Sequence, residues 1–497
     1  MPELLKIDDT VSLRGHVVPV GLFINGEWLP VTDTFDLVNP ADGSVIAKVA
    51  NGTGEDASVA LAAADNAQEN WRAYPPRVRA NLFHKAHALL LSRAEAFADI
   101  MVLESGKPLV EARAEFSLSA DFFLWYAEQI AHLHGTYASG SYGGYRVVTT
   151  HFPVGPCFLV TPWNFPFLMI ARKAGAALAA GCTVITKSAK ETPLTSAYFV
   201  KTLQDAGFPP GVINLIHTTS SAEISAAIMD DERLRKISFT GSTGVGSALL
   251  KQASTNIVNS SMELGGDGPF IVLEDADIDL AVQHAIISKF RNAGQACVAA
   301  NRIIVHKEVE AEFTRKFVEQ TEKLVIGDGF GTVDVGPIIS AAQRDRVVKL
   351  VTDLLGIGAT LLSGGKSIDG PGFFHEPTVF RITDRHHDLC NEELFAPVAT
   401  IYPVNSIVEA IEFANHTNYG LAAYVFTKDL SRAIAVSERL EFGMVGVNRG
   451  IMADPAAPFG GIKSSGIGRE GGHEGIYEFL EAKYLAITID EKKSLEN

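Results

Sequence analysis

The chain changes its pattern of apolar and polar residues several times. Near the start, "GLFINGEWLP" holds an Asn-Gly pair between apolar flanks, which predicts a β-hairpin. From Gly54 to about Leu133, apolar residues recur at spacings of three and four, and this periodicity predicts a series of helices. The following stretch, "GTYASGSYGGYRVVTTHFPVGP", is rich in Gly, Ser, Tyr and β-branched residues, so we expect an extended ribbon that leaves the helical body and pairs with another element.

After Val154, strands alternate with helices. Short apolar runs such as "CFLVTP", "TVITK", "VINLIH", "KISFTG" and "FIVLED" are separated by helical stretches, and a similar alternation resumes after residue 300. This order predicts βαβ units and a parallel, doubly wound α/β sheet. No repeat with a period of about 20–50 residues is present. The tail, "YLAITIDEKKSLEN", predicts one strand followed by a charged end.

Composition narrows the class of protein. A length of 497 residues suits about two to four domains. The formal charge of −16 argues against nucleic acid or an anionic membrane surface as the main partner. We find no secretory signal and no apolar run of about 18 residues that would span a membrane. The four cysteines form no C-x-x-C pair, so we expect reduced thiols, no metal site and a cytoplasmic location.

Polar residues follow two of the predicted strands. In "TPWNFP", Asn164 stands at a strand end, where ligands gather in open α/β sheets. Its amide could donate to a developing oxyanion or simply cap the turn. In "ITKSAKETP", Lys187 could reach a ribose or phosphate, or be solvated, and Lys190 adds a second cation that would favour an extra phosphate.

Two further motifs contain glycines. "FTGSTGVG" leads from a strand through a glycine turn into a helix, an arrangement that favours a phosphate. Its order is neither G-x-G-x-x-G nor a Walker A loop, and alone it fits an ordinary structural turn. In "MELGGDGPFIV", Glu263 lies between apolar residues that would raise its pKa and suit a general base, although a solvated or ion-paired glutamate is the alternative.

The stretch "KFRNAGQACVAANR" places Cys297 among small residues, which leave room for a substrate carbonyl. A thiol there is either a nucleophile or an inert core residue. In "NEELFAPV", Glu393 could bind a ribose diol and Phe395 could face a flat ring, but alone this is a surface loop.

Taken together, "TPWNFP", "FTGSTGVG", "MELGG", "GQACV", "EELFAP" and "PFGGIKSSGIGRE" resemble the aldehyde dehydrogenase superfamily in order and spacing, from about residue 20 to 485. The resemblance implies two doubly wound Rossmann-type α/β domains plus a small β-ribbon for oligomerisation. It places a dinucleotide-binding domain at 1–131 and 153–263, a catalytic domain at 264–475 and the ribbon at 132–152 and 476–497. A homodimer or homotetramer follows from such a ribbon.

The resemblance also implies a mechanism. Cys297 attacks the aldehyde, the Asn164 side chain and the Cys297 backbone N–H hold the oxyanion, and a hydride passes to the nicotinamide. Glu263 then activates the water that hydrolyses the thioester. The positions that match cofactor-binding residues are Thr161, Pro162, Trp163, Lys187, Gly241, Ser242, Glu393 and Phe395. Lys190 stands where many NAD-preferring relatives have Glu, so we expect NADP to be preferred, with NAD as the alternative cofactor.

Arg172 and Arg291 resemble the arginines with which succinate-semialdehyde dehydrogenases hold the far carboxylate of their substrate. The alternative is that Arg291 forms a structural ion pair and Arg172 lines the tunnel. Asp454 stands near the position where those enzymes supply a serine, and it would repel an anion if it pointed inward. An aromatic or longer ω-carboxy aldehyde is therefore an alternative substrate, with Phe165 and Phe459 as apolar walls.

Three other classes of protein are compatible with parts of the sequence. A CoA-acylating aldehyde dehydrogenase would need no water-activating base, so Glu263 favours hydrolysis. A cofactor-free cysteine hydrolase would need a histidine beside Cys297. A non-catalytic descendant is disfavoured because Cys297, Asn164 and Glu263 are all present. Ala299 replaces the second cysteine that lets some relatives form a local disulfide.

Overall fold

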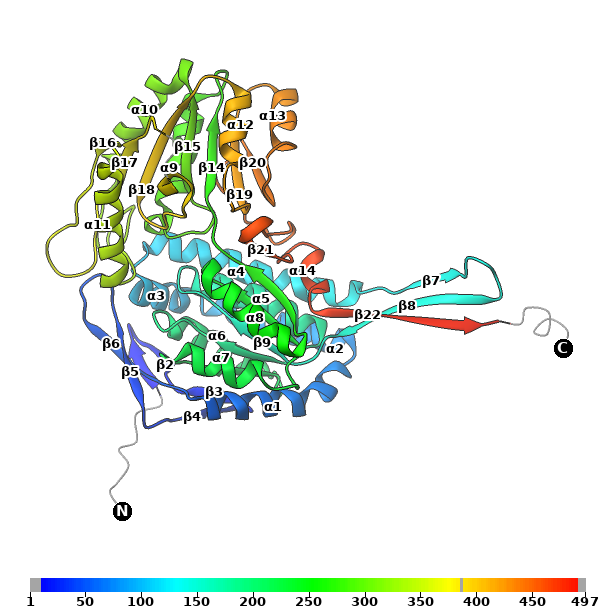
Figure 1. Cartoon of the computed structure of the whole chain (residues 1–497). Coiled ribbons are helices and arrows are strands. Elements are labelled where there is room, and N and C mark those ends of the chain that lie inside the picture. Colours follow the sequence, from blue (N-terminus) through cyan, green and yellow to red (C-terminus); the bar gives the residue numbers. More distant parts are fainter. Residues whose placement is uncertain (1–9, 385–387, 490–497) are drawn as a thin grey trace.

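Two large sheets organise the chain, as the alternation of strands and helices predicts. The computed structural model describes residues 10–384 and 388–489. Within them, the first sheet has the strand order β21 (Gly466–Ile467), β13 (Asn259–Glu263), β12 (Lys236–Thr240), β9 (Cys157–Val160), β10 (Val184–Lys187), β11 (Ile213–Ile216), β3 (Leu22–Ile24) and β4 (Glu27–Leu29). The second has the order β16 (Thr360–Ser363), β17 (Thr378–Arg381), β18 (Val398–Val404), β15 (Ala300–His306), β14 (Gly268–Val272), β19 (Ala422–Phe426) and β20 (Met444–Val447), and lies above the first in Figure 1.

Helices cover both faces of the first sheet. One core layer lies under α2 (Pro76–Ser92), α3 (Ala94–Ser105), α4 (Leu109–Gln129), α5 (Pro166–Ala180) and α6 (Pro193–Ala206), and the other under α1 (Gly54–Arg72), α7 (Ser221–Met229) and α8 (Thr243–Asn256). Alternation along β9 shows the division, because Leu159 packs in the first layer and Phe158 and Val160 in the second. The pairs β9–β10, β10–β11, β9–β12 and β12–β13 are parallel, which confirms the doubly wound prediction.

The second sheet has its own core and its own helices. These are α9 (Ile278–Phe290), α10 (Lys307–Thr321), α11 (Ala341–Gly356), α12 (Ile407–Asn415) and α13 (Leu430–Ser437). The chain passes from the first sheet to the second between Glu263, which ends β13, and Gly268, which begins β14. The chain later returns to the first sheet, where β21 pairs with β13. The predicted catalytic domain, 264–475, therefore contains one strand of the first sheet.

Smaller elements complete the body. The Asn-Gly hairpin forms as predicted between β3 and β4, with Asn25 and Gly26 at φ 52° and 84°. Two further hairpins join β1 (Thr10–Leu13) to β2 (His16–Pro19) and β5 (Thr34–Val38) to β6 (Val45–Ala50). The short helices are η1 (Ile130–His132), η2 (Arg291–Gly294), η3 (Asp388–Asn391), η4 (Lys463–Ser465) and α14 (Glu474–Tyr477).

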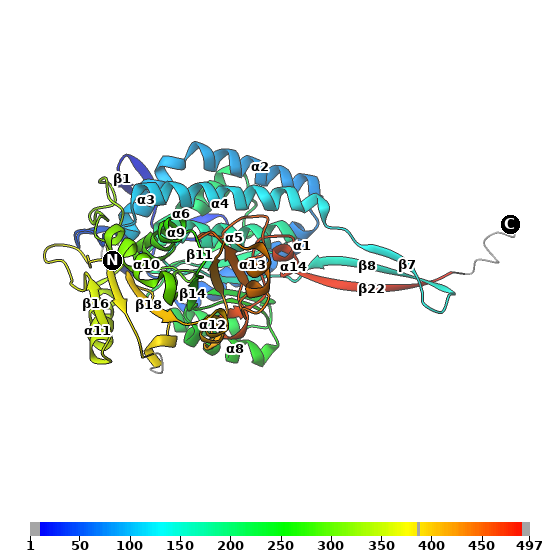
Figure 2. The same cartoon turned by 90° about the horizontal axis from the view of Figure 1, so that it is seen from above.

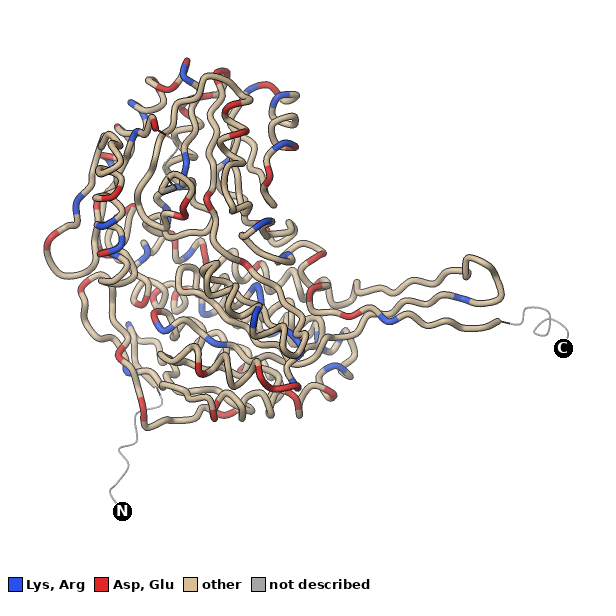
Figure 3. Tube along the Cα trace, viewed as in Figure 1, with Lys and Arg blue, Asp and Glu red and all other residues tan. Residues whose placement is uncertain are grey.

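An arm projects from the body, as Figures 1 and 2 show. It consists of β7 (Thr136–Ser139), β8 (Tyr145–Pro153) and β22 (Leu480–Thr488) in the antiparallel order β22-β8-β7. Few charged residues lie along it in Figure 3, while Tyr137, Tyr142 and Tyr484 are exposed. The predicted charged tail, from residue 490, lies outside the described residues. None of the helices in the described part of the chain combines the length and the apolar character needed to cross a membrane.

Candidate active site

The loop that carries Cys297 begins with an unusual backbone. Asn292, Ala293 and Gly294 all have positive φ, at 53°, 54° and 71°. Such a conformation is strained for Asn and Ala and persists only where contacts hold it. The Glu111 carboxylate accepts a hydrogen bond from the Asn292 backbone N–H at 2.9 Å, and a Cβ on Gly294 would lie 2.1 Å from the Ala396 carbonyl oxygen. These contacts fix the backbone just before Cys297, which is half-buried and lies between η2 and β15.

Asn164 lies against the same loop. Its Nδ2 donates to the Gln295 carbonyl at 3.2 Å, and its Oδ1 accepts from the Phe165 backbone N–H at 3.1 Å. The side chain therefore caps its own turn through oxygen and keeps one amide hydrogen for another acceptor. Buried Lys107 fixes the Asn164 backbone by donating to its carbonyl at 2.9 Å. The oxyanion role remains a prediction, and this position is compatible with it.

Glu263 ends β13, is buried, and belongs to a group of four buried ionisable residues that we call the base cluster: Glu263, Glu470, Arg172 and Lys173. Glu470 accepts from Lys173 Nζ at 2.6 Å and lies 2.5 Å from Arg172 Nε. Glu263 Oε2 has no hydrogen-bond partner among the described residues. Burial, and then the charge of Glu470, raise the pKa of Glu263 well above its usual value. A buried carboxyl with a raised pKa suits a general base.

Arg172 and Arg291 differ in what they contact. Arg172 is buried, pairs with Glu470, and has its guanidinium 4.1 Å from the centre of the Phe459 ring. The structure therefore gives Arg172 a carboxylate partner within the chain. Its Nη1 still lacks a hydrogen-bond partner among the described residues. A direct role of Arg172 in holding a substrate carboxylate remains a prediction that this pairing does not favour.

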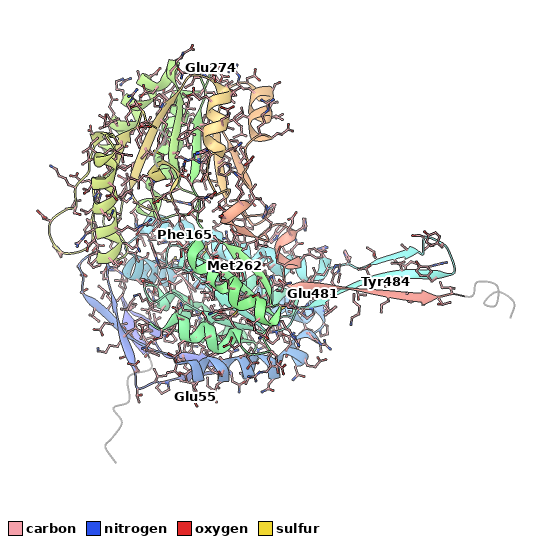
Figure 4. All side chains as sticks on the ribbon, viewed as in Figure 1. Glu55, Phe165, Met262, Glu274, Glu481 and Tyr484 are labelled. Atoms are coloured by element: carbon pink, nitrogen blue, oxygen red, sulfur yellow. The ribbon has the colours of Figure 1, made fainter. Side chains whose placement is uncertain are left out.

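Arg291 is half-buried, and its guanidinium lies 5.1 Å from the centre of the Phe165 ring. Within residues 10–384 and 388–489 we find no hydrogen bond or ion pair for this guanidinium, so the structural ion pair considered as the alternative is not formed there. Figure 4 labels Phe165 at the level where the two lobes meet. The pKa of nearby Glu111 is raised to about 7 by burial, with Arg291 opposing the shift. Arg291 is thus a half-buried cation beside the nucleophile's loop, with no hydrogen bond to its guanidinium from the described residues.

Asp454 forms a local turn at the edge of this region. The residue is exposed, and its Oδ1 accepts a hydrogen bond from the Ala456 backbone N–H at 2.9 Å. This local turn occupies the carboxylate. Because Asp454 also lines a cavity with Met452 and Phe459, its repulsion of a substrate anion stays a prediction.

The residues predicted for the adenine side of the cofactor lie at the carboxyl ends of neighbouring strands. Ser242, exposed, is the N-cap of α8, but its side chain makes no capping hydrogen bond, so it is available to a phosphate beside Gly241. Lys187 is buried and donates to the Ser188 carbonyl at 3.1 Å, and burial lowers its pKa to about 8. The Lys190 side chain is 59% exposed, with the Glu191 carboxylate 4.0 Å away. Thr161 and Pro162 precede Trp163 in the turn after β9.

Residues predicted for the nicotinamide side gather near Cys297. The Trp163 and Phe395 rings meet edge to face at 5.5 Å, and Phe395 has a positive φ of 48°. Glu393 Oε1 accepts from the Gly266 backbone N–H at 3.0 Å, and burial raises the Glu393 pKa to about 7. The pKa of the Cys297 thiol rises to about 12, through burial first and the Glu393 charge next, so the thiol is protonated at rest.

Sequence reasoning missed several buried charged residues. Glu393 belongs to a second group, the ribose cluster, made of Glu393, Asp267, Arg302 and Lys289. Of the missed residues, Glu470 ends the quoted motif "PFGGIKSSGIGRE", and Lys173 directly follows Arg172. No local pattern signalled that they would meet. In the described part of the chain no group of three or more His, Cys, Asp or Glu side chains could hold a metal ion.

Comparisons with known proteins agree on one family. The aldehyde dehydrogenase family model matches residues 28–485. The chain is 46% identical to a succinate-semialdehyde dehydrogenase of Paenarthrobacter nicotinovorans, over 89% of this chain and 99% of that protein. It is 41% identical to a glutarate-semialdehyde dehydrogenase of Pseudomonas putida, over 94% and 97%. A solved Escherichia coli structure, described as an NADP dependent enzyme, superposes with a TM-score of 0.93 at 39% identity, covering 95% of this chain and 98% of that one.

Proposed function

The chain belongs to the aldehyde dehydrogenase family and is an NAD(P)-dependent oxidoreductase acting on aldehydes, and we propose that its substrate is a short semialdehyde with a far carboxylate, such as succinate or glutarate semialdehyde. The observation that carries this proposal is Arg291. A half-buried guanidinium that packs on Phe165 and has no partner in the described residues offers paired N–H donors to a carboxylate. The names of the relatives support the same substrate class.

The proposed chemistry assigns one task to each residue. A bound nicotinamide supplies the hydride acceptor. Cys297 releases its proton to water and its sulfur bonds to the aldehyde carbon, while Asn164 Nδ2 and the Cys297 backbone N–H donate to the resulting oxyanion. Loss of hydride leaves an acyl group on Cys297. Glu263 takes a proton from water, the oxygen of that water bonds to the acyl carbon, and the carbon–sulfur bond breaks to release the acid.

Substituting Arg291 tests the substrate class. In Arg291→Met, kcat/KM for succinate semialdehyde should fall about 10–100-fold, because a charge-assisted contact with the substrate is lost. Butanal, a neutral aldehyde with the same carbon skeleton, is the matched control and should lose much less. Steady-state rates of NADPH formation measure both. Equal losses with the two aldehydes, or no loss with either, would refute the carboxylate role of Arg291.

The cofactor choice forms part of this proposal. NADP is preferred over NAD because Lys190 is an exposed ammonium at the end of the segment that follows β10, close to Lys187. A 2′-phosphate gains from two nearby cations, whereas a ribose hydroxyl gains little. Ser242 at the start of α8 contributes to binding the pyrophosphate.

The arm supports a homodimer or homotetramer. Tyr142 is 99% exposed, Tyr137 is 70% exposed and Tyr484 is 57% exposed, and Figure 4 labels Tyr484 along the arm. Large apolar side chains on a thin ribbon gain from being covered. The edge strand β20 of the second sheet offers an unpaired edge to another copy. Sedimentation should show an assembly that Tyr142→Asp together with Tyr484→Asp weakens, and a wild-type monomer would refute it.

A further inference from the structure

Lys107 is a buried lysine to which the proposed mechanism gives no task. It stands between α3, which ends at Ser105, and α4, which begins at Leu109, and its side chain is 0% exposed. Its Nζ lies 2.5 Å from the carboxylate of Glu115, which is also buried. Desolvation offsets much of the attraction in a buried ion pair, so such a pair is weak evidence of a role in stability alone. The other contacts of the two side chains therefore indicate what the pair does.

Lys107 contacts the backbone of the predicted oxyanion donor directly. Its Nζ donates to the Asn164 carbonyl at 2.9 Å. Asn292 Nδ2 donates to the same carbonyl, also at 2.9 Å, from the loop that leads to Cys297. A carbonyl oxygen has two lone pairs, so the Asn164 oxygen is held once from the α3–α4 connection and once from the nucleophile's loop. These two bonds fix the peptide that follows Asn164.

Glu115 holds the other end of the same turn. Its Oε1 accepts from the backbone N–H groups of Phe167 at 3.0 Å and Leu168 at 3.2 Å. These donors lie in the first turn of α5, where the helix itself supplies no acceptors, and the N-cap residue Phe165 makes no side-chain capping bond. A carboxylate is also favoured at the amino end of a helix by the helix dipole. Glu115 therefore caps α5 from α4.

The surroundings fix Lys107 itself. A Cβ on Gly329, in the segment between α10 and α11, would collide with the Lys107 carbonyl oxygen. The Leu109 backbone N–H donates to the Gly329 carbonyl at 2.8 Å. At the other end of the side chain, Nζ lies 4.6 Å from the centre of the Phe165 ring. Both the backbone and the ammonium of Lys107 are therefore held, which lets the side chain hold the turn in its place.

Resting on the proposed oxyanion role of Asn164, we propose that Lys107 and Glu115 are positioning residues: they hold the two ends of the turn 164–168 and so keep the Asn164 amide aimed at the aldehyde oxygen. Asn164 Nδ2 already donates one hydrogen to the Gln295 carbonyl at 3.2 Å, so one hydrogen is left for the oxyanion. A donor stabilises a developing charge fully where its position is set beforehand. A displacement of this backbone by about 1 Å is enough to lower the rate.

The test is a single turnover of the full-length enzyme, in which stopped flow follows NADPH formation with enzyme and NADP in excess over aldehyde. Lys107→Met combined with Glu115→Gln replaces the ion pair by a neutral pair. The Gln oxygen can still accept from α5, but the Asn164 carbonyl loses its donor. The rate constant should fall about tenfold, while NADPH affinity, measured by fluorescence, should stay at its wild-type value.

The rate constant distinguishes positioning from a loss of folded enzyme. Partial unfolding lowers the amount of active enzyme, but it leaves the rate constant unchanged when that enzyme saturates the aldehyde. Where the neutral pair fails to fold, Lys107→Met alone makes the same test, because Glu115 keeps its bonds to α5.

Two comparisons tie the effect to Asn164. In an Asn164→Ala background, which should itself cost about 10²–10³-fold, the neutral pair should lower the rate constant no further, because the amide that it positions is gone. The loss should also be equal for succinate semialdehyde and butanal, since both form the same oxyanion. Arg291 packs on the Phe165 ring, as Lys107 does, so a loss confined to succinate semialdehyde would place the effect at Arg291.

The matched control is Lys236→Met, which removes another fully buried lysine. Lys236 begins β12, level with Cys157 at the start of β9, whereas Asn164 follows the end of β9. Its Nζ donates to Asn259 Oδ1 at 2.7 Å and to Ser261 Oγ at 2.6 Å. This variant should keep the wild-type rate constant.

Each result decides between two claims. The inference is overturned, and the proposed function left intact, by a wild-type rate constant in the neutral pair, by an equal loss in Lys236→Met, by a loss that multiplies fully with that of Asn164→Ala, or by a loss confined to succinate semialdehyde. A wild-type rate constant in Asn164→Ala instead removes the proposed oxyanion role, and the inference with it.

Discussion

The base cluster and the ribose cluster both act on Cys297, through Glu263 and Glu393, and have the same composition, two acids and two bases, but they pair differently. In the base cluster Glu470 pairs with both cations, and Oε2 of the second acid, Glu263, has no hydrogen-bond partner among the described residues. In the ribose cluster Asp267 holds Arg302, so one acid and one base are left, Glu393 and Lys289.

The difference shows that pairing, rather than composition, sets the chemistry of a buried charge. Burial first, and then the charge of neighbouring Glu470, raise the pKa of Glu263 and favour its protonated form. In the ribose cluster burial also raises the pKa of Glu393, to about 7, but its Oε1 accepts a hydrogen bond from the Gly266 backbone N–H, which opposes that shift. The first arrangement suits proton transfer, whereas the second suits holding a diol.

The largest expected effect comes from removing the unpaired acid of the base cluster. Glu263→Gln should lower steady-state turnover about 10²–10⁴-fold, because no base remains to activate water. The first hydride transfer should survive as a burst of about one NADPH per site, measured by stopped flow, since the acyl group stays on Cys297. Normal turnover would show that Glu263 is not the base. A thermal melt controls for folding.

A smaller effect should follow from removing the paired acid. Glu470→Gln leaves Arg172 and Lys173 buried without their partner, so urea unfolding should show a loss of about 3–5 kcal/mol. The same change removes a charge that raises the Glu263 pKa. Because the base works when ionised, activity rises with pH through that pKa, and the acid limb of the rate profile should move to lower pH.

The ribose cluster supplies the control for this experiment. Asp267→Asn breaks the pair with Arg302 and should cost a similar stability, but it should leave the acid limb attributed to Glu263 where it is. If both variants move that limb equally, the two clusters do not act separately, and the contrast drawn between them fails.

The smallest effect is expected outside both clusters. Lys190→Glu should lower kcat/KM with NADP about 10–100-fold, through repulsion of the 2′-phosphate, and change it much less with NAD. Because the Lys190 side chain is 59% exposed and far from the buried pairs, the melting temperature should hardly change. An unchanged preference between the two cofactors would remove Lys190 as the discriminating residue.

Several parts of the fold could be read from local pattern. The alternation after Val154 predicted a parallel sheet, and the pairings of β9 with β10 and β12 confirm it. The Asn-Gly pair predicted a hairpin that the structure contains. The family followed from six short motifs in order, and the family model matches 28–485. Each of these features depends on neighbouring residues, so a short window of sequence carries the information.

Contacts between segments that are distant in the chain could not be predicted from short windows of sequence. The sequence predicted that Arg172 and Arg291 both bind the far carboxylate of the substrate. In the structure Arg172 pairs with Glu470, and the Arg291 guanidinium packs on the Phe165 ring. The sequence did not show that the Asp454 carboxylate accepts a hydrogen bond from the Ala456 backbone N–H. Lys289 gave no signal, because burial of a lysine depends on elements that pack over it.

The sequence by itself determined which elements form and which chemical groups are present: a thiol, a carboxyl in apolar surroundings, an amide at a strand end and a glycine turn before a helix. These are local properties of side chains and of backbone periodicity. Only the tertiary structure decided which charges pair, which remain unpaired, and how far each pKa moves. Pairing depends on distances between segments far apart in the chain, and desolvation depends on everything packed around the group.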